Sequence, residues 1–196
     1  MADSLAPDAV RPLLRGRFGK VYRYAEVTPS TQRMLGEDSV EGAVAVTEEQ
    51  TEGRGRLGRR WEAAPGTSIL VSVLLVPPVE PPRLPELSLV AGGAVAQAIA
   101  EITGIEPAIK FPNDLLIGMR KVAGILAESS EGRVVLGVGV NVNQTAQELP
   151  ADTLTPPTSL RVVLGEPVDR ARLLVAILLH LERDYDAWTT GTAASG

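Results

Sequence analysis

The feature that most constrains the fold is a nearly apolar run from Ser68 to Val76. It is rich in valine, leucine and isoleucine, and a continuous apolar run of this length indicates a strand in the centre of a sheet. After a proline-rich connection, residues 87–102 place Leu, Val and Ile at helical spacings among alanines. This pattern predicts a helix buried on at least one side, packed closely against the sheet at Gly92 and Gly93.

The remaining patterns predict further strands and two more helices. The strands are expected over residues 21–27, 42–47, 107–110, 114–117, 121–128 and 134–143, the last two as antiparallel neighbours. The helices are expected over residues 159–164 and 169–188, and a short helical segment capped by Thr28 or Ser30 follows the first strand. Together these elements predict an α+β fold with a mixed, largely antiparallel sheet and helices on one face.

The composition narrows the class of function. A chain of 196 residues with 44% hydrophobic residues can form one domain with a sizeable core, and a net charge of -5 argues against broad nucleic-acid binding. The absence of cysteine excludes disulfides and thiolate metal sites, and a single histidine, His180, excludes a histidine metal cluster. Because residues 1–20 lack a signal-like apolar segment and no run approaches about 18 apolar residues, a soluble cytoplasmic protein is expected.

One segment combines backbone freedom with positive charge. Four arginines and three glycines lie between Gly53 and Arg60. The glycines disfavour a helix and let the backbone approach a ligand closely, while each guanidinium can bind phosphate or carboxylate oxygens. The segment therefore predicts a mobile loop that a small anionic ligand orders. A solvated linker or a contact to single-stranded nucleic acid is the alternative interpretation.

Two of the three lysines border apolar strands. Lys110 begins the segment Lys-Phe-Pro-Asn-Asp, and Lys121 begins the segment Lys-Val-Ala-Gly-Ile-Leu. A cation at the edge of a buried strand is costly unless an anion meets it. We therefore expect both lysines to join the arginine-rich loop in a pocket for a carboxylate and a phosphate. Residues 110–114 taken alone are equally compatible with an ordinary strand-ending turn.

Five linked motifs resemble those of biotin protein ligases in order and spacing. Gln50 stands three residues before the first glycine of the loop, as in that family. The motifs are Ser-Thr-Gln (30–32), Gly-Arg-Gly-Arg-Leu-Gly-Arg-Arg-Trp (53–61), Lys-Phe-Pro-Asn-Asp (110–114), Lys-Val-Ala-Gly-Ile-Leu (121–126) and Gly-Val-Gly-Val-Asn-Val-Asn (137–143).

The resemblance implies a catalytic domain over residues 21–188 with a fold like that of class II aminoacyl-tRNA synthetases and biotin ligases. Residues 1–20 are expected to be a lead-in and residues 189–196 a frayed tail. The small C-terminal β-barrel that usually follows in the family is not expected in this chain.

The resemblance also implies a two-step reaction. The carboxylate of biotin attacks the α-phosphorus of ATP, giving biotinyl-5′-adenylate and pyrophosphate, and a lysine amine of a biotin carboxyl carrier domain of a biotin-dependent carboxylase then displaces AMP. Mg²⁺ is expected with ATP, without a dedicated metal site in the protein. No DNA partner and no membrane are expected, and self-association as a homodimer through an edge strand is left open.

Residue roles follow from the matched positions. Lys121 resembles the lysine that contacts the carboxylate and the α-phosphate. With Lys121, the biotin site is expected to comprise Ser30, Thr31, Gln32, Gln50, Arg54, Gly55 and Arg56. The nucleotide site is expected to comprise Arg54, Arg56, Arg59, Trp61, Asn113, Asp114 and Asn141, with Gly139 beside Asn141 on the pocket floor. The catalytic set is expected to be Lys121, Arg56 and Asp114.

Asn113 and Asp114 are expected either to serve ATP–Mg²⁺ or to orient the incoming lysine amine. Phe111 and Gln32 stand where the family usually has Trp and Asn. The missing indole N–H at position 111 implies the loss of any contact that this group makes in relatives.

Two other functions compete with this one. A lipoate ligase or transferase shares the fold and the adenylate chemistry, but its loop typically contains a histidine, which this segment lacks. A biotin-binding or regulatory module without transfer activity is the second alternative. The absence of a helix-turn-helix before the first expected strand disfavours a DNA-bound repressor.

Overall fold

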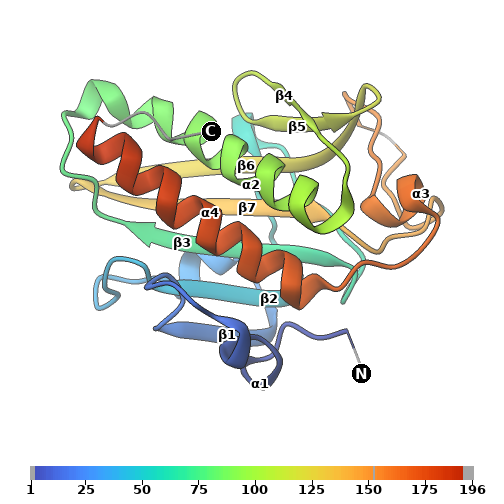
Figure 1. Ribbon diagram of the computed structural model, residues 1–196, viewed down its shortest axis with the longest axis horizontal. Coiled ribbons are helices and arrows are strands. Elements are labelled where there is room, and N and C mark those ends of the chain that lie inside the picture. The colour runs from blue at the N-terminus through green and yellow to red at the C-terminus, as the bar shows by residue number, and fades with distance from the viewer. Residues whose placement is uncertain (1–2, 152, 192–196) are drawn as a thin grey trace.

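The computed structural model describes residues 3–151 and 153–191. Its centre is a seven-stranded sheet with the strand order β1-β2-β3-β7-β6-β5-β4 (Figure 1). β1 and β2 are parallel, and every other neighbouring pair is antiparallel. The strands are β1 (Tyr22–Thr28), β2 (Val44–Gln50), β3 (Ser68–Leu75), β4 (Ala108–Lys110), β5 (Asp114–Ile117), β6 (Arg120–Ser130) and β7 (Arg133–Asn141). The predicted mixed, largely antiparallel sheet is thus confirmed.

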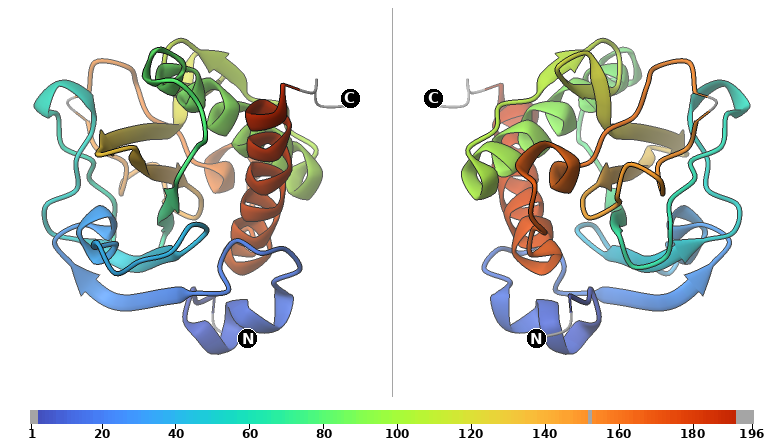
Figure 2. Two further views of the ribbon diagram at one scale, coloured as in Figure 1. Left: turned by 90° about the vertical axis from the view of Figure 1, so that its left-hand side faces the viewer. Right: turned by 90° about the vertical axis from the view of Figure 1, so that its right-hand side faces the viewer.

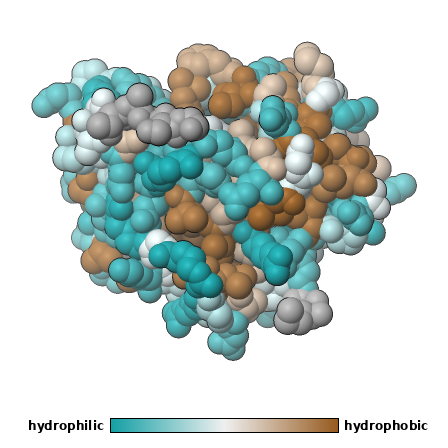
Figure 3. Space-filling model, in the orientation of Figure 1, coloured by the Kyte–Doolittle hydropathy of each residue, from teal (hydrophilic) through white to brown (hydrophobic). Residues whose placement is uncertain are grey.

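Two long helices, α2 (Leu87–Thr103) and α4 (Arg170–Thr190), lie side by side on one face of the sheet (Figures 1 and 2). The carboxylate of Asp169 caps α4 by accepting from the backbone N–H of Arg172 (3.0 Å). Hydrophilic side chains cover much of this helical side (Figure 3). Within the described ranges, no helix is long and apolar enough to cross a membrane.

The shorter helical segments lie at connections. They are α1 (Pro7–Val10), η1 (Arg11–Leu13), η2 (Thr31–Met34), η3 (Arg56–Gly58), η4 (Pro81–Glu86) and α3 (Leu160–Leu164). Of the two capping residues considered for the segment after β1, Ser30 is the one whose side chain caps η2.

Both ends of the chain differ from the expected lead-in and frayed tail. Leu5, Val10 and Phe18 are buried in the main core, so the first twenty residues include part of the packed domain. Burial, together with the nearby Glu48 carboxylate, raises the pKa of the Tyr22 phenol, which donates to the carbonyl oxygen of Leu5 (2.7 Å). At the other end, α4 continues through residues 189 and 190. Residues 192–196 of the predicted tail lie outside the described residues.

Arg170, the first residue of α4, connects distant parts of the chain. Its side chain is 1% exposed, with Nε 2.7 Å from an oxygen of Asp3 and Nη1 2.6 Å from an oxygen of Glu48. Nη1 also donates to the carbonyl oxygen of Ser68 (3.0 Å), and Glu48 accepts from the backbone N–H of Leu5 (2.8 Å). A buried cation is tolerated here because two carboxylates and two backbone carbonyl groups, those of Asp3 and Ser68, meet it. The N-terminal segment, β2, β3 and α4 are therefore joined at one end of the sheet.

We predict that Arg170→Ala lowers the free energy of unfolding by about 3–5 kcal/mol, because it leaves two carboxylates without their buried partner. Urea denaturation followed by circular dichroism measures this loss. Arg172→Ala is the matched control, since the Arg172 side chain on the same helix is 74% exposed. Its expected effect is below about 0.5 kcal/mol. Equal losses in the two variants would contradict the role given to Arg170.

Candidate functional site

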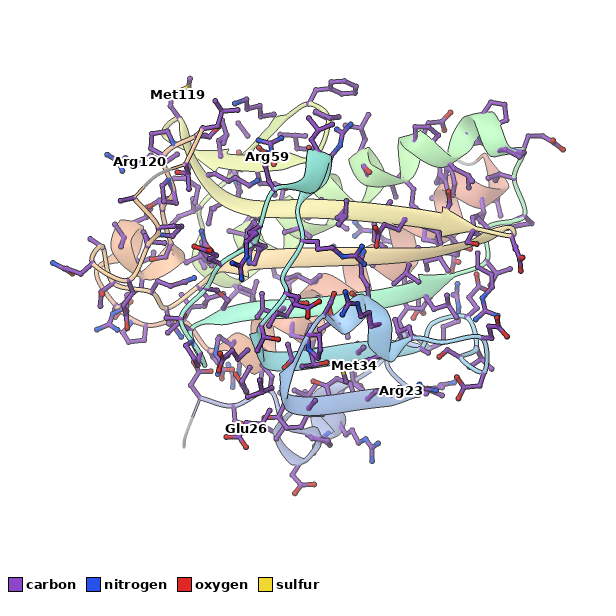
Figure 4. The ribbon with its side chains drawn as sticks, turned by 180° about the vertical axis from the view of Figure 1, so that it is seen from behind. Arg23, Glu26, Met34, Arg59, Met119 and Arg120 are labelled. Carbon is purple, nitrogen blue, oxygen red and sulfur yellow. The ribbon has the colours of Figure 1, made fainter. Side chains whose placement is uncertain are left out.

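A pocket of about 330 Å³ lies on the face of the sheet that α2 and α4 leave open. It is lined by residues from η2, from one end of each of β2 and β5, from β3, β6 and β7, and from the segment over residues 54–62. The segment before α3 contributes Pro150, Thr153, Leu154, Thr155 and Pro157. In the view from behind, the segment that carries Arg59 crosses in front of the sheet, and Met34 marks η2 nearer to β1 and β2 (Figure 4).

The floor of the pocket is shaped by glycines, which have no side chain. Gly139 of β7 pairs directly with Gly124 of β6, and Gly137 lies two residues before Gly139 on the same face. A β-carbon at Gly139 would lie 2.6 Å from the indole of Trp61, and one at Gly124 would lie 2.8 Å from it. Val138, between the two glycines of β7, belongs to the main core. The glycines therefore leave a depression that larger residues would fill.

The indole of Trp61 lies in this depression. Nζ of Lys121 is 5.4 Å from the centroid of the indole, within the range of a cation–π contact. The indole N–H is buried, and it has no hydrogen-bond partner among the described residues. The sequence placed Trp61 on the nucleotide side of the pocket, and in the structure it stands on the glycine floor beside Lys121.

Four polar residues predicted for biotin binding come together at the η2 end of the pocket. The backbone N–H of Thr31 donates to Oε1 of Gln50 (2.8 Å), and the Thr31 hydroxyl lies 3.2 Å from the same oxygen. The hydroxyl oxygen of Ser30 accepts from the backbone N–H of Gln32 (3.4 Å), and the Gln32 amide donates to the carbonyl oxygen of Leu126 (3.2 Å). This end of the pocket thus presents a concentrated set of hydrogen-bonding groups.

Charged groups line another part of the same pocket. Nζ of Lys121 lies 2.7 Å from a carboxylate oxygen of Asp114, and the two side chains are 25% and 18% exposed. The backbone of Lys121 donates to the carbonyl oxygen of Pro156 and accepts from the N–H of Thr158, both at 2.8 Å. The backbone of Lys121, near the start of β6, is therefore bonded to residues 156–158, and one carboxylate balances the charge of its side chain.

The arginine-rich segment forms an irregular hairpin. Arg54 and Arg60 make an antiparallel bridge, and the backbone N–H of Trp61 donates to the carbonyl oxygen of Gly53 (3.0 Å). The tip is η3, where Leu57 has a φ of 59° and is 88% exposed. A positive φ is unfavourable for leucine, so the hairpin holds its tip in a strained conformation.

The arginines of this hairpin differ in their contacts. Arg54 pairs with Glu128 (3.3 Å), and the Nε of Arg59 donates to the carbonyl oxygen of Arg56 (3.2 Å). Arg56 makes a long contact, 3.5 Å, with the side-chain oxygen of Asn113. Arg54, Arg56 and Arg59 all line the pocket that also contains Lys121. The predicted convergence of cations from two separate segments is present in the structure.

The two predicted asparagines are held by neighbouring backbone groups. The side-chain amide of Asn113 donates to the carbonyl oxygen of Ile125 (2.8 Å). Asn141 is 5% exposed, donates to the carbonyl oxygen of Thr158 (3.0 Å) and accepts from the amide of Gln144 (3.1 Å). Both residues line the pocket, and these bonds fix the strands and the loop around it.

Lys110 does not join the pocket, contrary to the expectation. It lies at the exposed end of β4, where its Nζ donates to the hydroxyl of Thr155 (3.1 Å). The cost of a buried cation does not arise, because β4 is an edge strand whose three residues are all exposed. Residues 111–113 make the turn into β5, with a cis Phe111–Pro112 peptide and a Phe111 side chain that is 76% exposed.

Several lining residues were not predicted from the sequence. Ser72 of β3 is the only polar residue among residues 69–75, and this interruption of an apolar strand was the available signal. Gly124 and Gly137 lay inside matched motifs, but their pairing across β6 and β7 required the sheet register. Pro150, Thr153 and Leu154 belong to a loop whose sequence carries no comparable pattern.

Comparisons with known proteins agree with this geometry. The model of the Biotin/lipoate A/B protein ligase family matches residues 24–144. The chain is 39% identical over 182 residues to the "Bifunctional ligase/repressor BirA" of Bacillus subtilis, covering 88% of this chain and 56% of that protein. It is 40% identical over 153 residues to the "Biotin--[acetyl-CoA-carboxylase] ligase" of Mycobacterium tuberculosis, covering 76% and 56% respectively. The chain thus spans about half the length of these curated relatives.

Solved structures show the same fold. The biotin protein ligase of Aquifex aeolicus in complex with biotin and ATP superimposes with a TM-score of 0.80 and 34% identity, over 88% of this chain and 73% of that one. From the matched family model, the sequence identities and this superposition, the chain belongs to the biotin/lipoate A/B protein ligase family, with a fold shared by its biotin protein ligases.

Proposed function

We propose that this protein is a biotin protein ligase that forms biotinyl-5′-adenylate from biotin and ATP and transfers biotin to a lysine of a carrier domain. One observation supports this most: Arg56 and Lys121, from separate segments, line a single pocket whose η2 end is rich in hydrogen-bonding groups. The complex of the Aquifex relative with biotin and ATP supports the choice of substrates.

The charges of the pocket suit the first step. A carboxylate that attacks the α-phosphorus of ATP and displaces pyrophosphate brings two anions together, and fixed cations reduce this repulsion most as charge develops in the transition state. Lys121 contacts both the biotin carboxylate and the α-phosphate, and Arg56 reaches the same two groups from the hairpin. Asp114 keeps the lysine in position until the substrates engage it. No side-chain nucleophile is needed, because biotin supplies its own carboxylate.

The rest of the pocket divides between the two substrates. Ser30, Thr31, Gln32 and Gln50 bind the ureido ring of biotin, and Arg54, Gly55 and Arg56 close over its carboxylate and the adenylate phosphate. The nucleotide contacts come from Arg59, Trp61, Asn113 and Asn141. A closed hairpin also shields the acyl-adenylate from water.

Mg²⁺ accompanies ATP in this proposal. In the described part of the chain, no group of three acidic, histidine or cysteine side chains could hold a metal ion by itself. The pocket offers Asn113 and Asp114, whose oxygens suit a magnesium ion that is bound mainly by phosphates and water. Mg²⁺ would neutralise charge on the leaving pyrophosphate.

The second substrate is proposed to be the biotin carboxyl carrier domain of a biotin-dependent carboxylase, as the name of the Mycobacterium relative indicates for that protein. A net charge of -5 supports the prediction that this chain does not bind DNA. Cytoplasmic location and self-association through the exposed edge of β1 or β4 remain predictions.

Incubation with Mg-ATP and either biotin or lipoate tests the proposed function. We expect biotinyl-adenylate, detected by mass spectrometry, and no lipoyl-adenylate. Chelation of Mg²⁺ should abolish the product. Lipoyl-adenylate alone would assign the protein to the lipoate branch of its family. Failure to form either adenylate would favour the alternative of a biotin-binding module without transfer activity.

Lys121→Ala is expected to slow adenylate formation by about 100- to 1000-fold, the usual effect of removing one group that stabilises transition-state charge. Pyrophosphate release under single-turnover conditions measures the rate. Lys110→Ala is the matched control, because Lys110 is exposed and lies outside the pocket. Equal rates in the two variants would remove the catalytic role of Lys121.

Arg56→Ala is expected to release biotinyl-adenylate into solution about tenfold faster, since one charge-assisted hydrogen bond of about 1.5 kcal/mol or more is lost. Filtration of the enzyme after a single turnover separates free from bound adenylate. Arg15→Ala serves as control, because the Arg15 guanidinium only donates to nearby backbone carbonyl groups. Unchanged release would mean that Arg56 does not retain the intermediate.

A further inference from the structure

The segment over residues 30–39 carries η2 and lies on the face of the sheet that α2 and α4 leave open (Figure 4). Its hydrogen bonds between backbone groups all remain within the segment, and in the described ranges none of them reaches a strand. A segment that no backbone ladder holds is placed by side-chain contacts. The side chains that attach it therefore decide where Thr31, the first residue of η2, stands in the pocket.

A small apolar cluster, separate from the main core, packs against this segment. Ala45 and Leu74 of the cluster follow Val44 and Val73 of the main core, so the cluster lies on the opposite face of the sheet. Its members are Leu35, Ala43, Ala45 and Leu74, with Met34 and Val135 partly buried against them. So few apolar side chains stabilise the segment less than the main core stabilises the sheet, and local opening costs less than global unfolding.

Arg133, the first residue of β7, binds three carbonyl groups near the end of the segment. Its Nη2 donates to the carbonyl oxygens of Ser39 (2.7 Å) and Gly36 (3.4 Å). Its Nη1 donates to the carbonyl oxygen of Glu37 (3.2 Å). The planar guanidinium presents several donors in a fixed geometry, so one side chain can hold a whole turn of backbone.

Arg23 of β1 holds the same segment from the other side. Its Nη1 donates to the carbonyl oxygen of Met34 (2.7 Å), the last residue of η2, and Figure 4 shows the two residues close together. The end of a helical turn leaves carbonyl groups without a partner inside the helix, and a charged donor satisfies one of them here. Its Nη2 also pairs with Asp38 (2.8 Å), whose side chain is 76% exposed, so this pair contributes little.

We propose that Arg133 and Arg23 are positioning residues that hold η2, and with it Thr31, in the geometry that binds the ureido ring of biotin. This inference rests on the proposed function. Neither arginine is among the described residues that line the pocket, and neither lies in one of the five motifs. When the segment opens, only the fraction of molecules with η2 in place can bind the ligand, so the apparent affinity falls.

The dissociation constant for biotin, measured by calorimetry, and steady-state kinetics test this role in Arg133→Ala and Arg23→Ala. We expect the Kd and the KM for biotin to rise severalfold in each variant. The upper limit is about tenfold, the effect of one charge-assisted hydrogen bond. KM for ATP and kcat should stay unchanged, because the residues assigned to the nucleotide and to the chemistry keep their contacts.

Hydrogen exchange followed by mass spectrometry reports on the segment itself. Amides over residues 31–39 should exchange faster in both variants, whereas those of β3 should exchange as in wild type. Arg161→Ala is the matched control, because Arg161 also donates to a backbone carbonyl group but bonds to Asn143 (3.4 Å) rather than to the segment. Its Kd for biotin should equal that of wild type.

An unchanged Kd for biotin in folded Arg133→Ala and Arg23→Ala overturns the inference, even if the segment exchanges faster. An equal rise in Arg161→Ala, or an equal rise in KM for ATP, overturns it as well. A rise in one variant alone overturns the role of the other arginine.

If Arg133→Ala does not fold, Arg133→Lys keeps the charge without the planar fork, and an unchanged Kd there overturns the role of Arg133. If wild type binds no biotin, the proposed function fails. Normal adenylate formation by wild type, with an unchanged Kd in both variants, refutes the positioning role alone.

Discussion

The pocket depends on the direct pairing of two glycines, Gly124 and Gly139, on adjacent antiparallel strands. Strand side chains alternate between the two faces of a sheet, so glycine at these positions removes bulk from one face only. On the other face, Ala123, Ile125 and Val138 continue the core beneath α2 and α4 without interruption. The sheet can thus be hollowed to seat the Trp61 indole, which lines the pocket, while its opposite face continues the core.

Around this floor, hydrogen bonds to backbone groups of β6 hold two walls of the pocket, whereas the arginines stand on a hairpin. Thr158 and Pro156 bond to the backbone of Lys121, and Asn113 bonds to Ile125, so two connections are fixed directly to β6. The arginines come from a hairpin with a strained, exposed tip, and Arg56 has only a long contact to Asn113. Such a division suits a site whose walls must be preorganised and whose cover must move for substrates to enter.

Much of this arrangement could be predicted from the sequence, because local patterns determine the elements. The apolar run over β3, the alternation of β6 and β7 and the spacing in α2 and α4 gave the sheet and its helical cover. The lysine at position 110 was misjudged because its sequence neighbours are partly apolar, whereas β4 is an exposed edge strand. Exposure depends on the order of strands, which local sequence does not specify.

Ser72 illustrates the same limit at the level of single bonds. Its polarity within an apolar strand was visible in the sequence, but its contact with Thr31 of η2 exists only in the folded chain. A motif that contains only Thr31 does not indicate this neighbour. Residues that contact motif residues from a neighbouring strand are thus the part of a binding site that local sequence is least able to identify, since their contacts depend on the register of the sheet.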